Sequence, residues 1–242
     1  AQTFWARSKR SEAKGRTTEG KETHFFVQTI RTAFDRLVAQ GVEPSDAVFL
    51  FDRGYDAHAI LSLINQKIEM VLRAQYNRRL ADGPGKQRRY LFDALQESPV
   101  CDRDFSFPLA ATSKRAARTV KTEIRVCQVT LELKVGSSRR AKVTMNAVEV
   151  REVGGPGKDA LLWRLLTTRA CKTRKQWRAV IRAYSYRWRI EEVHRAWKDG
   201  GGHVEKMGLR KRDAILKWSV VAPISERGRE ATDDLAIGRQ PQ

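Results

Sequence analysis

The 242-residue sequence is poor in the residues that mark several common classes of protein. It holds three cysteines, Cys101, Cys127 and Cys171, and no two of them form a Cys-x-x-Cys pair. This pattern argues against a disulfide framework and a zinc site, and it favours a reducing, cytoplasmic compartment. No apolar run reaches the ~18–20 residues of a membrane-spanning helix, so the sequence predicts no membrane association.

Acidic residues are also scarce compared with basic ones. The chain has 28 Asp and Glu against 47 Lys and Arg, which gives a formal net charge of +19 and an isoelectric point near 10.3. A surplus of this size favours a polyanionic partner through counterion release and long-range attraction. Charge alone does not distinguish a DNA enzyme from a ribosomal or chromatin protein.

An initiator methionine is missing, and the chain begins at Ala1. The first residues contain no apolar centre of the kind found in a signal peptide. We therefore expect a processed, trimmed or fragmentary chain.

The apolar pattern of the first part predicts alternating helices and strands. Residues 24–40 place apolar side chains at helical spacing and are followed by Gly41, a typical helix terminator. The run 47–51 predicts a strand buried on both faces, residues 58–67 a helix, and residues 69–73 a further core strand. This order indicates an α/β sheet.

Functional groups in α/β sheets gather at the carboxyl ends of strands. Asp52 and Arg53 follow directly after the first predicted strand. They are therefore candidate site residues, although an aspartate at the end of a strand is about as often a helix cap.

The centre of the chain, residues 77–157, predicts a basic antiparallel β region. Strand-like runs cover residues 104–109, 122–135 and 141–153, with turn signals between them. Basic segments in this region are expected to form an electrostatic footprint on DNA, with a merely solvated surface as the alternative. Residues 161–168 predict another buried strand, and a long helical stretch follows it.

One polar pattern stands out in that last helical stretch. Tyr184, Arg187, Glu191 and Lys198 follow one another at spacings of three, four and seven residues, which aligns them on one helical face. An ordinary solvated face with salt bridges is the usual explanation of such a stripe.

The spacing Y-x2-R-x3-E-x6-K resembles the signature of the insertion-sequence-four family of DDE transposases, and the wording around it is similar to the Tn-five type. Upstream, FDRGYDAHAIL resembles the second-aspartate motif of the family, and KETHFF, VLR and LLWRLLT resemble its neighbouring segments. The resemblance covers roughly residues 2–221.

The resemblance implies a ribonuclease-H-like core, a mixed sheet flanked by helices and interrupted by an inserted antiparallel β-rich region. We expect the core in residues 1–76 and 158–221, the insertion in 77–157 and a disordered tail in 222–242. It also implies a cytoplasmic, nucleoid-associated bacterial protein.

The same resemblance implies a metal-dependent DNA chemistry. Asp52 and Glu191 would be catalytic ligands for Mg²⁺, with Mn²⁺ as a substitute, because two divalent ions clamp the attacking and leaving oxygens of a phosphoryl transfer. Transposon ends and target DNA would be the partners, with a homodimer in the synaptic complex.

Six residues would contact DNA if the resemblance holds. Backbone phosphates would be bound by Tyr184, Arg187, Lys198, Arg53 and Arg73, and an unpaired base would stack on Trp163. Ordinary surface positions and ion pairs are the alternatives for the first five, and core packing for Trp163.

The first aspartate of a DDE site is not recognisable in the sequence. Asp35 lies in a predicted helix and Asp46 in a predicted turn, so neither ends a central strand. We expect the core to be truncated at its N-terminal strands and inactive alone. A DNA-binding module or transposition inhibitor is the competing hypothesis.

Overall fold

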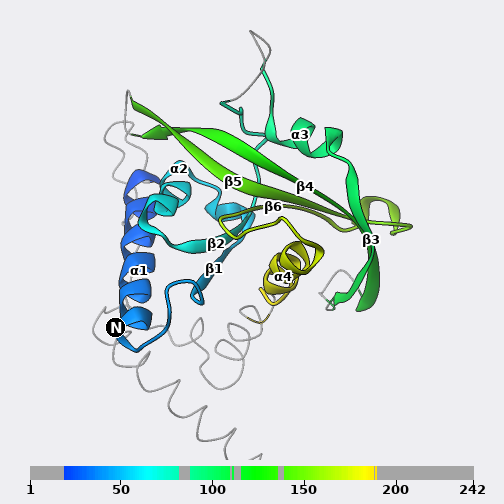
Figure 1. The fold of residues 1–242 in the computed structure, drawn as a ribbon, viewed down its shortest axis with the longest axis horizontal. Helices are drawn as coiled ribbons and strands as arrows, with labels where there is room; N and C mark the ends of the chain where they lie inside the picture. The colour runs from blue at the N-terminus through cyan, green and yellow to red at the C-terminus, as the bar shows by residue number, and fades with distance from the viewer. Residues whose placement is uncertain are drawn as a thin grey trace, which may run out of the picture. The chain divides into compact units, whose positions relative to one another are not determined.

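The computed structural model describes residues 19–81, 88–109, 111, 116–135, 139–187 and 189. The chain divides into two compact units, residues 1–185 and 186–242. The described part of the first unit is built around one six-stranded sheet with the strand order β1-β2-β6-β5-β4-β3 (Figure 1). The mixed sheet and its flanking helices confirm the predicted α/β class and are consistent with a ribonuclease-H-like core.

The first half of the unit follows the predicted order of helices and strands. Its elements are α1 (Glu19–Ala39), β1 (Val48–Phe51), the 3-10 turn η1 (Arg53–Tyr55), α2 (His58–Leu61), the 3-10 helix η2 (Ser62–Gln66) and β2 (Glu69–Arg73). The predicted second helix is therefore split into a short α-helix and a 3-10 helix.

The second half adds the long strands of the sheet. Its elements are α3 (Leu91–Glu97), β3 (Val100–Leu109), β4 (Arg118–Val135), β5 (Arg139–Glu152), the 3-10 turn η3 (Gly157–Asp159), β6 (Leu162–Thr167) and α4 (Arg174–Ser185). The three strands predicted in the central region are present, whereas α3 was not predicted.

Strand pairing joins the central region to the rest of the sheet. β1 and β2 are parallel, and β2 pairs antiparallel with β6, with Val71 opposite Thr167. β6 pairs antiparallel with β5, and β5 with β4 and β4 with β3 continue the antiparallel order. The β-rich segment predicted as an insertion thus extends the same sheet as β1, β2 and β6.

Two apolar clusters cover the two faces of the sheet. On β2, Met70 and Leu72 belong to one cluster and Val71 to the other, as expected when successive side chains point to opposite faces. The first cluster includes apolar residues of α1, α2 and α3, and the second includes Val180 and Ile181 of α4. α4 is therefore fixed on the face opposite to the other helices.

β1 lies at the edge of the described sheet, and this position limits its burial. Phe49 and Phe51 pack against one cluster and Val48 and Leu50 against the other, so both faces are in contact with apolar residues. Phe51 alone among the four is fully buried. The predicted burial of this strand on both faces is thus only partial, because its outer edge has no neighbouring strand in the described sheet.

The end of α1 confirms the expected role of Gly41. Gly41 has φ +86°, and its amide donates to the carbonyl of Val38 at 2.9 Å while the amide of Val42 donates to that of Leu37 at 3.0 Å. A left-handed glycine of this kind completes the hydrogen bonds of the last helical turn.

Within the described residues, no helix is long and apolar enough to cross a membrane.

Candidate active site

Asp52 lies at the carboxyl end of β1, where the sequence predicted it. It also caps the 3-10 turn η1, since its Oδ1 accepts a hydrogen bond from the backbone amide of Arg53 at 2.8 Å. The aspartate therefore has a structural role in the turn at the same time as it presents a carboxylate beside the end of the strand.

Tyr184 of α4 forms a contact between that helix and the carboxylate of Asp52. Its side chain is 2% exposed, and its hydroxyl donates to Oδ1 of Asp52 at 3.3 Å. The two residues are 132 positions apart in the sequence, one directly after β1 and the other in α4. The structure thus places the tyrosine of the Y-x2-R-x3-E-x6-K pattern against the aspartate of the upstream motif.

Trp163 stands beside Tyr184 in a row of aromatic rings. The ring centroids of Trp163 and Tyr184 are 5.0 Å apart in an edge-to-face arrangement, and those of Trp163 and Phe107 are 5.3 Å apart. Trp163 is partly buried against the second apolar cluster. In this arrangement the indole contributes to core packing, and its stacking on an unpaired base stays a prediction.

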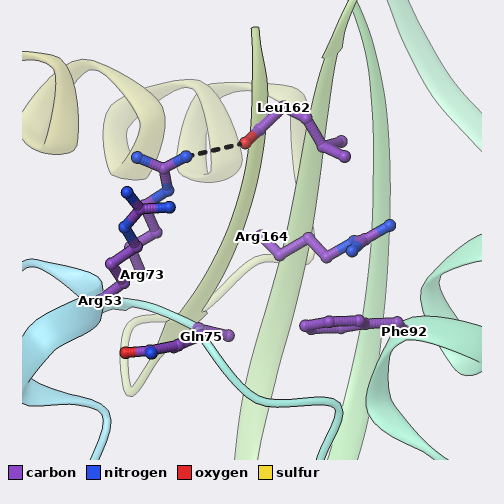
Figure 2. Close-up of a pocket in the computed structure, with 7 residues that line it drawn as sticks. Arg53, Arg73, Gln75, Phe92, Leu162 and Arg164 are labelled. Atoms are coloured by element: carbon purple, nitrogen blue, oxygen red, sulfur yellow. Dashed lines mark hydrogen bonds between the residues drawn. The ribbon is translucent and has the colours of Figure 1, made fainter. Parts of the chain in front are cut away.

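A basic hollow of about 160 Å³ has Arg53, the residue that follows Asp52, in its lining. The residues that line it come from the ends of β1, β2 and β6 and from α3: Arg53, Arg73, Ala74, Gln75, Phe92, Leu162 and Arg164. Figure 2 shows Arg53 and Arg73 on one side of the hollow and Arg164 with Phe92 on the other. Sequence reasoning identified the two arginines on the first side.

Arg73 is held at its guanidinium end by the backbone of β6. Its Nη2 donates to the carbonyl of Leu162 at 3.3 Å, the bond drawn in Figure 2. This contact fixes the guanidinium at the rim of the hollow, beside Arg53, which also lines it.

Arg164 is fixed from two sides, and sequence reasoning did not identify it. Its Nε donates to Oε2 of Glu149 at 2.8 Å, and its guanidinium lies 4.1 Å from the ring centroid of Phe92. Glu149 is 1% exposed and also contacts Arg151 at 3.3 Å. Phe92 was not predicted as a site residue because its helix, α3, was not predicted. Arg164 was not predicted because its strand was interpreted only as part of the core.

The lining of the hollow is suited to an anion. Three arginines, Arg53, Arg73 and Arg164, line it, and none of the described residues that line it carries a carboxylate. Guanidinium groups bind phosphate oxygens through paired N–H donors. The hollow therefore has the chemistry of a phosphate-binding site.

The remaining predicted site residues, Arg187, Glu191 and Lys198, belong to the second unit. Arg187 is in a turn at residues 186–187. Glu191 and Lys198 lie outside the described residues. Asp35 is in α1 and Asp46 in the turn before β1, as expected, so neither lies at the end of a strand.

Of the two predicted metal ligands, Asp52 is among the described residues. In the part of the chain that the structure describes, no three His, Cys, Asp or Glu side chains are grouped as metal ligands. Asp52 offers one carboxylate at the end of β1, and its expected partner Glu191 is not among the described residues. The donor type fits a hard divalent cation, which prefers oxygen ligands.

Comparison with known families agrees with the geometry. A family model described as "Transposase DDE domain" matches residues 15–221, which is most of the chain. The match includes Asp52, the residues around the basic hollow, and the whole Y-x2-R-x3-E-x6-K pattern.

Proposed function

Because the chain belongs to the family of transposases with a DDE domain, we propose that it is the catalytic core of a cut-and-paste DNA transposase of the insertion-sequence-four, Tn-five type. The observation that carries this proposal is the contact between Tyr184 and Asp52. It supports the interpretation that the two sequence motifs form one site. The finer assignment to this type rests on the motif spacing.

Asp52 and Glu191 are the residues that would hold the divalent ions, Mg²⁺ or Mn²⁺ in its place. The bound ions would neutralise the attacking and leaving oxygens during transfer of a DNA phosphoryl group. The hydroxyl of Tyr184 orients the carboxylate of Asp52, and burial of the tyrosine ring keeps that orientation fixed. This hydrogen-bonded pair is already formed in the chain without bound DNA.

The basic hollow would hold a DNA phosphate close to the metal-binding carboxylate. Arg53 and Arg73 supply guanidinium donors from one side of the hollow, and Arg187 and Lys198 would add further phosphate contacts from the last helical stretch. Transposon ends and target DNA are the expected ligands, and a homodimer is the expected state of the synaptic complex. The net charge of +19 supports a DNA ligand.

We infer that the chain alone binds DNA without cutting it. A DDE site needs three carboxylates, and only Asp52 and Glu191 match the motifs of the family. Loss of one carboxylate lowers the charge that binds the ions and removes an alignment that the reaction requires. A DNA-binding module or transposition inhibitor is the second candidate function, favoured by the arginines that line the basic hollow.

A combined binding and nicking assay tests the proposal. Duplex DNA is titrated with the chain in the absence and presence of Mn²⁺, and nicking of a plasmid is followed in parallel. We expect Mn²⁺ to raise the DNA affinity about tenfold, which is ~1.4 kcal/mol, because Asp52 would hold the ion and its positive charge would attract DNA phosphates. We expect no nicking.

Asp52→Ala should lose the effect of Mn²⁺, whereas Asp35→Ala, which removes a carboxylate from α1, should keep it. If the chain and Asp52→Ala respond equally to Mn²⁺, the metal role of Asp52 is wrong and the binding-module hypothesis stands. Nicking by the parent chain that disappears in Glu191→Ala would instead contradict the inferred inactivity and support an active transposase core.

A further inference from the structure

A second groove lies apart from the basic hollow and shares no lining residue with it. It has a volume of about 330 Å³ and is lined by His58, Tyr76, Arg78, Arg79, Glu132, Leu133 and Arg140. These residues come from the start of α2, from the segment after β2 and from the ends of β4 and β5 that are joined to each other. None of them has a role in the proposed metal site.

A buried carboxylate fixes the segment that forms one wall of this groove. The side chain of Asp56 is 0% exposed. It accepts hydrogen bonds from the backbone amides of Gln75 at 2.8 Å and Tyr76 at 3.0 Å, and from Nε of Arg78 at 2.9 Å. Because the carboxylate is satisfied by these donors, it acts as a rigid support for residues 75–78 rather than as a ligand.

Tyr76, in the segment that Asp56 holds, is exposed. Tyr76 is 55% exposed, and the guanidinium carbon of Arg78 lies 5.5 Å from the centroid of its ring. Its neighbour Leu80 is 6% exposed and bridges to Leu131 of β4, so the segment is tied down on both sides of the tyrosine. A large aromatic ring presented on a fixed backbone is suited to stacking with a flat ligand.

Cationic side chains flank this ring in the groove. Arg79 is exposed, and within the described residues it has no ion-pair partner. Arg140 is 60% exposed and pairs with Glu132 at 2.8 Å. Exposed ion pairs are worth little, so Arg140 can exchange its partner for a phosphate at small cost.

We propose that this groove binds an unpaired DNA strand, with Arg79 and Arg140 on its phosphates and Tyr76 stacked on a base. The combination of a cationic groove with an exposed aromatic platform is the general chemistry of single-strand binding. A base can stack on a tyrosine ring only when it is free of its own duplex stack. The groove therefore selects a strand that is single or has become unpaired.

Fluorescence anisotropy with the full chain and a labelled oligothymidine of about 15 nucleotides tests the proposal. Tyr76→Ala should weaken binding of this single strand about fivefold or more, whereas Tyr76→Phe, which keeps the ring, should bind like the parent. A labelled duplex of the same length should be bound equally by all three proteins.

Arg79→Ala should weaken single-strand binding and reduce the slope of log affinity against log salt by about 0.7. Arg103→Ala is the matched control, because Arg103 is 70% exposed, pairs with Glu123 and lies outside the groove. The proposal is overturned if Tyr76→Ala binds the single strand like the parent, if single strand and duplex lose affinity equally, or if the parent does not bind the single strand. Because this groove is separate from the Asp52 site, none of these results bears on the response to Mn²⁺.

Discussion

The hydroxyl of Tyr184 shows what helical spacing can and cannot predict about a single residue. Spacing placed the tyrosine on one stripe with Arg187, and it favoured an exposed position. The structure instead gives 2% exposure and a hydrogen bond to Asp52. A buried phenol usually has such a partner because an unsatisfied hydroxyl is costly.

Tyr184→Phe should lower the free energy of unfolding by about 1 kcal/mol, because it removes one partly buried hydrogen bond and keeps the ring. Tyr184→Ala should cost about 3–5 kcal/mol through the cavity it leaves. Chemical denaturation measures both. Tyr76→Phe is the control, since removal of an exposed hydroxyl should change stability by less than about 0.5 kcal/mol. An equal loss in both Phe variants would contradict a specific bond to Asp52.

The rest of the candidate site was predictable only where a motif marked it. Asp52 and Arg53 follow a recognisable strand, so the rule that site residues gather at strand ends found them. Arg73 was predicted through the family resemblance. Arg164 and Phe92 depend on the pairing of β6 with β5 and on the packing of α3. Contacts of this kind join segments that are distant in the sequence, so a local sequence pattern does not predict them.

An ion-pair cluster adds to the apolar packing that attaches α4 to the sheet. Asp102 of β3 is 3% exposed and accepts hydrogen bonds from Nε of Arg178 at 2.6 Å and Nη2 at 2.9 Å. Arg174 lies 3.8 Å from the same carboxylate. Because α4 carries Tyr184, this cluster also fixes the contact with Asp52.

Acid should weaken the attachment of α4. Hydrogen bonds from Arg178, with help from the amide of Asp104 and the indole of Trp177, lower the pKa of Asp102 from 3.8 to about 2. A lowered folded-state pKa adds stability that is complete above about pH 4 and is lost as the pH falls towards 2. Thermal unfolding followed from pH 5 to pH 2 measures this loss.

Asp102→Asn should be less stable than the parent at neutral pH and should lose less stability on acidification. Asp104→Asn is the matched control, because Asp104 is 77% exposed and its side chain lies 3.8 Å from Arg174. An Asp102→Asn profile parallel to that of the parent would contradict the assignment of the acid-sensitive step to this cluster.

Secondary structure was largely predictable because the apolar patterns are strong. The run EMVLR predicted β2 from Glu69 to Arg73, and the alternating central runs predicted β3, β4 and β5. α3 was missed because its seven residues are too few for a helical period to be recognised. The order of the strands was not predictable, since the antiparallel joining of β2 with β6 brings together segments separated by the whole central region.

At the scale of the whole molecule, the charge of +19 makes DNA binding sensitive to salt. If several phosphates are contacted, duplex affinity should fall about a thousandfold or more between roughly 50 and 200 mM salt. Arg73→Ala should reduce the slope of the log–log plot by about 0.9, and Arg103→Ala should leave it unchanged. Anisotropy titrations at several salt concentrations measure the slope. A flat plot would contradict an electrostatic origin of the affinity.

The segment after β2 faces both binding regions described above. Ala74 and Gln75 line the basic hollow, whereas Tyr76 and Arg78 line the second groove. Asp56 holds Gln75 and Tyr76 through two oxygen–amide bonds to the same carboxylate oxygen. A ligand that displaces one end of this segment would thereby strain the hydrogen bonds that hold the other end. By thermodynamic reciprocity, any coupling that results would have the same energy in both directions.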